Sequence, residues 1–179
     1  MMNCLHVVGR KNHGKTTLIV ELVQEFCRRG IRIGTIKHSR HAHELDTPGK
    51  DSYRHRQAGG QPAAIITPDS VGVFLSLHGE SVYQRLEPLF ADCQIVIVEG
   101  HIDAPGMKIE VWREAIGGAC LAGDRADIVA VVTDGQPRLS VPLWPRSDIV
   151  GLTDRVSALM ECGRVEEGGH SPAAKERDA

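Results

Sequence analysis

The sequence has few aromatic residues, no long apolar run and no closely paired cysteines. Aromatic residues make up 4% of the 179 positions and apolar residues 41%, which is enough for the core of a globular domain. No stretch approaches the roughly 20 apolar residues of a transmembrane helix, so no membrane association is expected. The five cysteines are dispersed, and with no secretory signal evident they are typical of reduced thiols in a cytoplasmic protein. A formal net charge of -2 argues against nucleic-acid binding through bulk electrostatics.

What the sequence does contain is a phosphate-binding motif close to its first residue. Residues 9–16 read GRKNHGKT and fit the P-loop pattern G-x-x-x-x-G-K-[ST]. The short apolar run 4–8 before the motif is strand-like, and apolar residues recur at helical spacing after it. The motif therefore has the strand–loop–helix context that it requires. The alternative is an ordinary glycine turn followed by a helix-capping threonine.

Each residue type in this motif has a chemical reason. Gly9 and Gly14 allow sharp backbone turns and keep side chains away from the phosphates. The N–H groups of the loop then form an anion-binding nest at the positive end of the helix dipole. Lys15 is expected to reach the β- and γ-phosphates, and the Thr16 hydroxyl to ligate Mg²⁺.

The remaining pattern predicts an α/β fold of the P-loop NTPase type, a mostly parallel sheet flanked by helices. Strands are expected at 4–8, 31–36, 94–98, 108–113 and 128–132, and helices after the P-loop to about residue 29, over 51–58, over 81–90 and over 152–160. Strands at 63–67 and 71–77 are expected to pair as a β-hairpin excursion, because the connection between them is short. Prolines predict an irregular connection at 142–145. We expect one nucleotide-binding domain over residues 1–162 and a disordered tail over 163–179.

Three acidic residues are candidates for the nucleotide site. Glu99 closes the most apolar strand, as an acid that holds Mg²⁺ would. Asp46 lies in the long polar loop 37–50, where a switch that senses the γ-phosphate could sit. The alternatives are a strand-end carboxylate that faces solvent and a simple turn aspartate. Asp134 follows the last apolar strand, where GTPases place an aspartate that reads guanine, but the asparagine and lysine of Asn-Lys-x-Asp are absent here.

The long loop and the short helix after it are rich in histidine and in basic residues. His38, His41, His43 and His55 could ligate a metal, but no cysteine pair accompanies them. Because lysine and arginine recognise phosphate groups, a positively charged surface for an anionic partner or substrate is the favoured interpretation. A plain solvated loop is the alternative.

Together with the P-loop, several later blocks resemble the MobB family, which serves molybdopterin-guanine dinucleotide biosynthesis. The blocks are IKH at 36–38, DTPGKDSYR at 46–54, AG at 58–59, VEG at 98–100 and KIEV at 108–111. The resemblance covers residues 2 to about 160, and the block PGKDS is far more specific than the P-loop. In the family an aromatic residue and a lysine commonly follow the Glu-Gly pair, whereas His101 and Ile102 follow here.

The resemblance implies a GTP-binding accessory protein that binds GTP with Mg²⁺, hydrolyses it weakly and forms a homodimer. Its partner would be a MobA-type guanylyltransferase, which joins GMP to molybdopterin, and molybdopterin itself is a further ligand to consider. Lys15 and Glu99 would be the catalytic residues, and Thr16, Glu99 and Asp46 would lie near the metal. The residues that would bind the nucleotide are Gly9, Asn12, His13, Gly14, Lys15, Thr16, Thr17 and Asp134.

Two other functions stay open from the sequence. A small-molecule kinase on the same fold would need arginines that close over the transferred phosphate, for which Arg54, Arg56 and Arg113 are available. A nonenzymatic adaptor would use the nucleotide only to hold its shape. Neither a water-positioning glutamine nor an arginine finger is evident, so slow hydrolysis, a weak GTPase at most, is expected.

Overall fold

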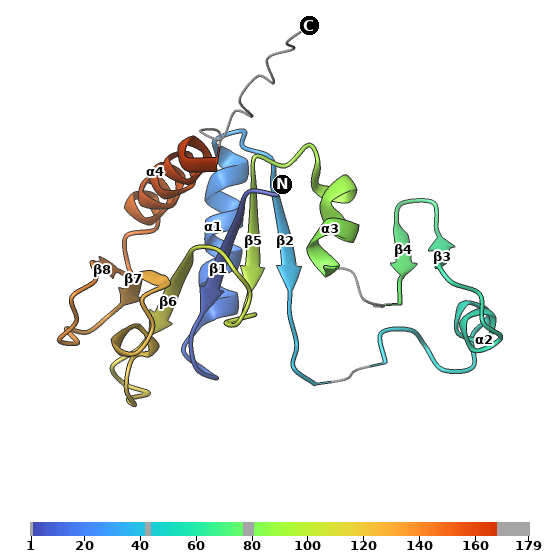
Figure 1. Ribbon diagram of the computed structural model, residues 1–179, viewed down its shortest axis with the longest axis horizontal. Helices are drawn as coiled ribbons and strands as arrows, with labels where there is room; N and C mark the ends of the chain where they lie inside the picture. The colour runs from blue at the N-terminus through green and yellow to red at the C-terminus, as the bar shows by residue number, and fades with distance from the viewer. Residues whose placement is uncertain (1, 42–43, 77–80, 168–179) are drawn as a thin grey trace, which may run out of the picture. The chain divides into compact units, whose positions relative to one another are not determined.

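A six-stranded parallel sheet carries the fold, with the strand order β2-β5-β1-β6-β7-β8 (Figure 1). The computed structural model describes residues 2–41, 44–76 and 81–167. Strands β1 and β2 are parallel, as a βαβ unit requires, and β5 lies between them. The elements in chain order are β1 (Cys4–Val8), α1 (Lys15–Arg28), β2 (Ile33–Lys37), α2 (Asp51–Gln57), β3 (Ala63–Ile66), β4 (Val71–Phe74), α3 (Val82–Leu86), the 3₁₀ helix η1 (Glu87–Phe90), β5 (Ile95–Glu99), β6 (Lys108–Trp112), the 3₁₀ helix η2 (Leu121–Gly123), β7 (Ile128–Thr133), β8 (Leu143–Pro145) and α4 (Ile149–Glu167).

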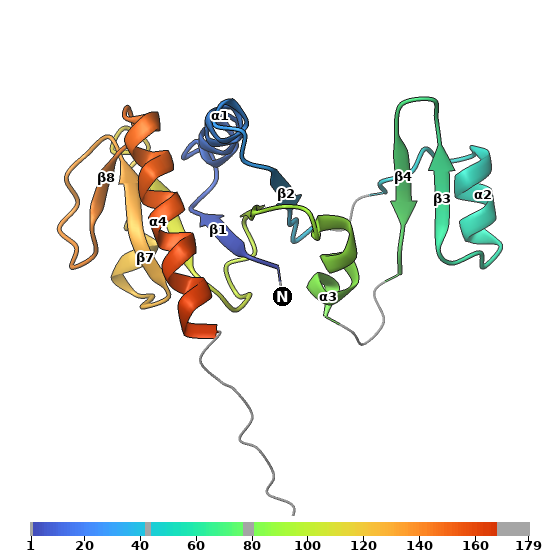
Figure 2. The same cartoon turned by 90° about the horizontal axis from the view of Figure 1, so that it is seen from above.

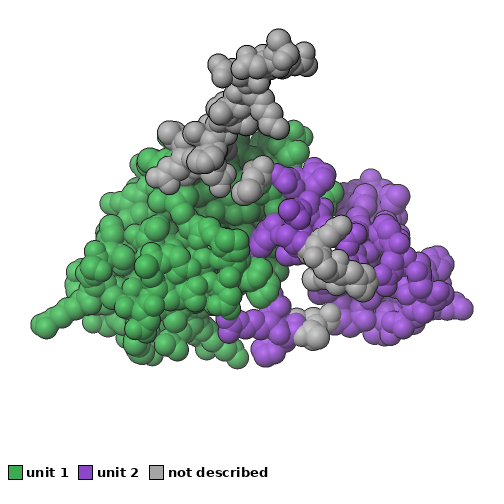
Figure 3. All heavy atoms as spheres, viewed as in Figure 1, with its two compact units in different colours: residues 1–38, 89–179 green, residues 39–88 purple. Residues whose placement is uncertain are grey.

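The chain forms two compact units, which Figure 3 shows in different colours. The first unit, Met1–His38 with Leu89–Ala179, contains the whole six-stranded sheet together with α1 and α4. The second unit, Ser39–Pro88, contains α2, α3 and a two-stranded sheet of β3 and β4. These two strands are antiparallel, which confirms the predicted hairpin, and Figure 2 shows α2 beside it.

Alternation along the parallel strands places one set of apolar side chains on a single face of the sheet. Leu5 and Val7 of β1 are fully buried there, as are Leu18, Leu22 and Phe26, which recur at helical spacing along α1. Helix α4 adds three residues to the same cluster, so α1 and α4 share this face (Figure 1). Strand β1 is thereby covered by the helix that follows the P-loop, which fixes where the loop emerges.

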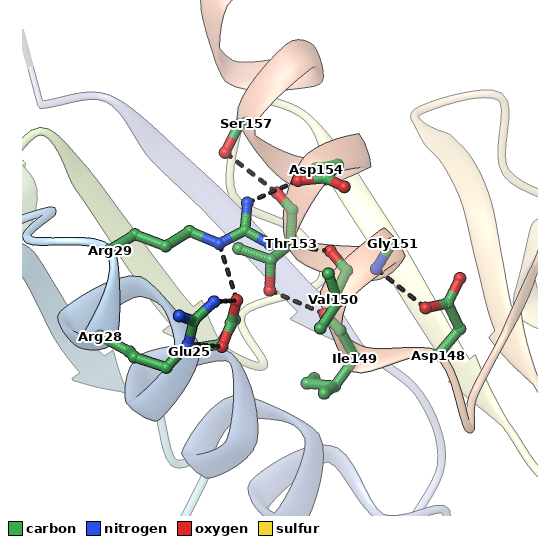
Figure 4. A network of polar contacts seen from close by, with 10 residues as sticks. All are labelled: Glu25, Arg28, Arg29, Asp148, Ile149, Val150, Gly151, Thr153, Asp154 and Ser157. Atoms are coloured by element: carbon green, nitrogen blue, oxygen red, sulfur yellow. Dashed lines mark hydrogen bonds and ion pairs between the residues drawn. The ribbon is translucent and has the colours of Figure 1, made fainter.

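Arg29, just after α1, links this helix to α4 (Figure 4). Its guanidinium donates Nε–H to Glu25 Oε1 at 2.8 Å, Nη1–H to Asp154 Oδ1 at 2.5 Å and Nη2–H to the Val150 carbonyl at 3.1 Å. Hydrogen bonds from Arg28 and then Arg29 lower the pKa of Glu25 to about 2. This network lies at the carboxyl end of α1, opposite to the P-loop, and its role is to hold the two helices together.

Several elements differ from the sequence-based expectations. Residues 143–145 form strand β8, parallel to β7, where an irregular connection was predicted. The expected helix over 81–90 is the short helix α3 followed by η1, which contains Pro88, a residue that cannot donate a helical hydrogen bond. Helix α4 extends from Ile149 to Glu167, beyond the position where the tail was expected to begin, and residues 168–179 lie outside the described residues. Strand β4 ends at Phe74, and part of its predicted extension also lies outside them. Within the described ranges, no helix is long and apolar enough to cross a membrane.

Candidate functional site

The P-loop backbone has the left-handed conformations that its glycines predict. The φ angles are 141° at Gly9, 69° at Asn12 and 89° at Gly14, which caps the amino end of α1. Asparagine tolerates the left-handed region better than most residues, so Asn12 fits its position. A Cβ atom at Gly9 would lie 2.5 Å from the carbonyl oxygen of Val111 on β6, so only glycine fits there. The P-loop backbone therefore packs directly against β6 at Gly9, and a side chain at this position would displace the loop.

Lys15 is folded back onto its own loop. Its ammonium donates hydrogen bonds to the carbonyl oxygens of Gly9 at 2.9 Å and Arg10 at 2.8 Å. Burial lowers the pKa of Lys15, and the negative charge of Glu99 partly opposes that effect. The ammonium group is thus held inside the loop by neutral acceptors, where phosphate oxygens would be stronger ones.

Glu99 and Thr16 meet at the carboxyl edge of the sheet. Strand β5 lies next to β1, with Glu99 paired to Val7, and this places the carboxylate beside the start of α1. The Thr16 hydroxyl donates to Glu99 Oε1 at 3.0 Å. The two residues that sequence reasoning placed near a metal are therefore in direct contact, and Glu99 does not simply face solvent. Lys37, at the end of β2, lies beside the same carboxylate, with its Nζ 3.4 Å from Oε1.

His13 anchors the P-loop to the sheet. Its side chain is 1% exposed, and its Nδ1 accepts the backbone N–H of Arg113 at 3.0 Å. Burial lowers the pKa of His13, which favours the neutral imidazole that can accept this bond. Because the ring is engaged in the interior, the predicted phosphate contact of His13 would come from its backbone, and it stays a prediction.

Asp134 directly follows β7 and accepts two hydrogen bonds at the same edge of the sheet. Its Oδ1 accepts the Glu114 N–H at 3.0 Å, and its Oδ2 accepts Nε–H of Arg113 at 3.3 Å. The pKa of Asp134 is lowered, chiefly by the Glu114 N–H. Residues 113 and 114 thus connect the P-loop histidine to Asp134. A cleft of about 420 Å³ adjoins Asp134 and lies between the segments after β7 and β8, with Gln136, Trp144 and Arg146 among its lining residues.

Asp46 lies in the second unit and is engaged locally. Its Oδ1 accepts Thr47 N–H at 2.8 Å and the Ser52 hydroxyl at 2.9 Å, and its Oδ2 lies 3.6 Å from Arg56 Nη1. Oδ2 is buried and makes no hydrogen bond. The predicted role of Asp46 near the metal stays a prediction, and these contacts also suit a residue that shapes the start of α2.

The histidines of the long loop do not form a metal site in the described part of the chain, where no cluster of three or more His, Cys, Asp or Glu side chains is found. His43 lies outside that part. His38 instead stacks on His101, with ring centroids 3.9 Å apart and an interplanar angle of 6°. His101 has a φ of 56°. The His101 ring, which follows Glu99-Gly100 where the family commonly has an aromatic residue, thus stacks on His38 in this chain.

The sequence places Lys37 in a basic loop that follows the carboxyl end of a strand, where parallel sheets place ligand-binding groups, and Arg113 in a kinase alternative. It does not reveal that Lys37 lies beside Glu99 or that Arg113 lies beside Asp134. The parallel register pairs Lys37 directly with Glu99.

Comparison with known proteins identifies sequences similar to this chain. Residues 4–134 match the family model of MobB, described as molybdopterin guanine dinucleotide synthesis protein B. The chain is 34% identical over 156 residues to the molybdopterin-guanine dinucleotide biosynthesis adapter protein of Escherichia coli, an alignment that covers 83% of this chain and 87% of that one. The Haemophilus influenzae protein of the same name is 31% identical over 114 residues, 62% of this chain and 63% of that one.

Solved structures show the same fold. The crystal structure of a MobB homologue from Bacillus stearothermophilus superposes with a TM-score of 0.64 at 24% identity, over 90% of this chain and 99% of that one. Bacillus subtilis MobB gives 0.65 at 21% identity, over 87% and 96%. The parallel sheet with its P-loop confirms the predicted fold class, and the sequence matches extend across the P-loop and Glu99. The chain therefore belongs to the MobB family.

Proposed function

We propose that this chain is a GTP-binding accessory protein of molybdopterin-guanine dinucleotide biosynthesis, with its nucleotide site at the P-loop. The observation that carries the proposal is the 3.0 Å contact between Thr16 of the P-loop and Glu99 at the end of β5. It joins the two groups that a Mg²⁺-dependent nucleotide site needs. The pathway comes from the relatives, whose names describe adapter proteins of this biosynthesis.

The chain's own groups suit a nucleotide's phosphates. The amino end of α1 and the left-handed turns at Gly9, Asn12 and Gly14 favour an anion there. Lys15 already has its ammonium within the loop, bonded to two carbonyl oxygens. On binding, we expect it to exchange these neutral acceptors for phosphate oxygens, which form stronger, charge-assisted bonds.

The oxygen donors at Thr16 and Glu99 also fit Mg²⁺. This ion prefers oxygen ligands at about 2.0–2.1 Å in octahedral geometry, so two adjacent ligands lie about 3.0 Å apart. The distance between Thr16 Oγ1 and Glu99 Oε1 is 3.0 Å. A bound Mg²⁺ would neutralise charge on the phosphates, and Glu99 would hold the ion directly or through water.

Asp134 and its cleft are our proposal for the base site. Guanine offers two neighbouring N–H donors, which an ionised carboxylate can accept. Asp134 is kept ionised by its lowered pKa, and each of its oxygens retains acceptor capacity beyond the bonds to Arg113 and Glu114. The adjoining cleft, about 420 Å³, lies within the range typical of ligand pockets.

We further propose that hydrolysis is slow and that the protein acts through a MobA-type guanylyltransferase, which joins GMP to molybdopterin. Slow hydrolysis is supported by the sequence, in which neither a water-positioning glutamine nor an arginine finger is evident. The partner is supported by the sequence resemblance and by the adapter names of the relatives.

A homodimer is also part of the proposal. The hairpin of the second unit exposes Ile65, Ile66, Val71 and Val73, with Ile66 78% and Val71 63% exposed. Apolar residues gathered on a small sheet favour burial against another chain. Light scattering on wild type and on Ile66→Glu tests this: the variant should be monomeric, and a monomeric wild type would contradict the proposal.

The decisive experiment is titration calorimetry with GTP and ATP, with and without Mg²⁺. Wild type should prefer GTP, and Lys15→Ala should bind neither nucleotide. Glu99→Gln should retain a weaker GTP affinity that no longer responds to Mg²⁺, whereas Glu161→Gln, on the exposed surface of α4, should behave as wild type. ATP preference would favour the kinase alternative, and no binding of either nucleotide would refute the proposed site.

The adaptor role needs its own measurement, with a purified guanylyltransferase of the MobA type. The protein should bind the transferase and raise the yield of molybdopterin-guanine dinucleotide, and both effects should weaken in Lys15→Ala. If Lys15→Ala bound and assisted the transferase as well as wild type, the protein would be an adaptor that does not need nucleotide.

A further inference from the structure

Lys37 lies at the end of β2, beside the acid of the proposed nucleotide site. Strands β2 and β5 are parallel neighbours, and their register pairs Lys37 with Glu99. The Lys37 ammonium lies 3.4 Å from Glu99 Oε1, and the side chains of the two residues are 69% and 16% exposed. The carboxylate is thus largely covered, while the lysine that reaches it comes from the solvent side.

The same carboxylate oxygen joins Lys37 to the P-loop. Glu99 Oε1 accepts the Thr16 hydroxyl at 3.0 Å while it faces the Lys37 ammonium. The positive charge of Lys37 also contributes to the lowered pKa of Lys15, so the two ammonium groups interact electrostatically. Two lysines therefore flank one acid at the mouth of the loop, Lys15 from the start of α1 and Lys37 from the end of β2.

The charges at this point favour an anionic ligand. Two lysines face a single carboxylate, and a divalent cation held by Glu99 would leave the Lys37 ammonium without its ion pair. Like charges then repel Lys37 from Glu99, and the terminal phosphate is the anion closest to the metal. Lysine is suited to this role because its flexible stem can carry the ammonium from one oxygen to another.

We propose that Lys37 is a second phosphate-binding lysine of this site, which contacts the terminal phosphate of a nucleoside triphosphate and thereby favours triphosphate over diphosphate. The inference rests on the proposed nucleotide function. Lys15 and the loop backbone would hold the phosphates that both nucleotides share. Lys37 would distinguish the two nucleotides, because it reaches the loop from the side of Glu99.

The test is calorimetry of GDP and of the non-hydrolysable triphosphate guanosine 5′-(β,γ-imido)triphosphate, both with Mg²⁺. Lys37→Met should weaken triphosphate binding about tenfold, the loss expected for one charge-assisted contact, and should leave GDP binding within about twofold. Lys37→Arg should restore most of the triphosphate affinity. Arg32→Met removes a positive charge just before the opposite end of β2, and it is the matched control that should leave both affinities unchanged.

The ratio of the two affinities separates this role from a structural one. If Lys37 only balanced the charge of Glu99, Lys37→Met would change both affinities by the same factor, and the inference would be wrong. An unchanged triphosphate affinity in Lys37→Met would overturn it as well. If wild type bound neither nucleotide, the proposed function would fail and this inference with it. Because Lys37 is mostly exposed, the variant should fold normally, which circular dichroism can verify.

Discussion

Burial of His6 should make the stability of the protein depend on pH. His6 lies within β1 and is 1% exposed. Its pKa is lowered from 6.5 to about 4: burial is the largest cause, the carbonyl of Gly100 opposes it, and the positive charges of Lys108 and His101 add to it. The folded state therefore keeps the imidazole neutral at pH values where the unfolded chain takes up a proton.

The sign follows from this difference in proton binding. Above pH 6.5 neither state is protonated at His6, and the residue has no effect on the pH dependence. As the pH falls below 6.5, only the unfolded state binds the proton, so the free energy of unfolding decreases until the pH reaches about 4. The full loss is at most about 3 kcal/mol, and the loss between pH 7.5 and pH 5.0 is about 2 kcal/mol.

Urea unfolding at these two pH values, followed by circular dichroism, measures the effect in wild type and in His6→Gln. The glutamine variant is expected to be less stable overall, but its stability should fall by about 2 kcal/mol less than that of wild type between the two pH values. His55→Gln, which alters an exposed histidine, should keep the wild-type dependence. An equal decrease in wild type and His6→Gln would refute the reasoning.

Three further outcomes are expected. Gly9→Ala should abolish GTP binding in calorimetry, because its Cβ would lie 2.5 Å from a carbonyl oxygen of β6. The control Gly30→Ala, with no atom within 4 Å of the added Cβ, should bind GTP normally. Normal GTP binding by Gly9→Ala would contradict this geometry. Arg29→Met should lower the melting temperature by about 3 °C or more because it removes the link between α1 and α4, and Arg28→Met, whose side chain is 67% exposed, should lower it less. Equal shifts would show that the link does not stabilise the fold. Asp134→Asn should reduce the preference for GTP over ATP by about tenfold in competition binding, because the amide cannot accept both N–H groups of guanine; an unchanged preference would remove Asp134 from the base site.

The parallel strands and the P-loop could be predicted because their signals are local. Fully apolar runs, a glycine motif and the positions of polar residues at strand ends can all be recognised in short windows. Strand β8 was missed because its three residues, of which Pro145 is the last, carry no alternating pattern. Its assignment as a strand depends on pairing with β7, which the sequence does not reveal. The last residues of α4, 163–167, were assigned to the tail because apolar residues are almost absent from residue 163 onward.

In the candidate site, too, local motifs indicated some residues, whereas contacts between distant segments could not be predicted. The P-loop motif indicated Thr16, and the end of an apolar strand indicated Glu99; the structure places the two in hydrogen-bond contact. The pairing of Lys37 with Glu99 depends on the register of two strands that are distant in the sequence. The inward orientation of the His13 ring depends on a hydrogen bond from the backbone N–H of Arg113, which directly follows β6. Such contacts follow from tertiary packing, which no motif encodes.

The central position of β1 has a consequence for synthesis of the chain. β1 is the first strand to be made, yet its neighbours begin much later, since Cys4 pairs with Val96 and His6 with Lys108. At about 5–20 residues per second, the nascent β1 waits roughly 5 to 20 s for its first strand partner, with the backbone groups of both its edges unpaired. The hairpin of β3 and β4 is made in this interval and has local partners. Translation that stops before β6 is complete should therefore release fragments that aggregate, even though they contain the entire phosphate-binding motif.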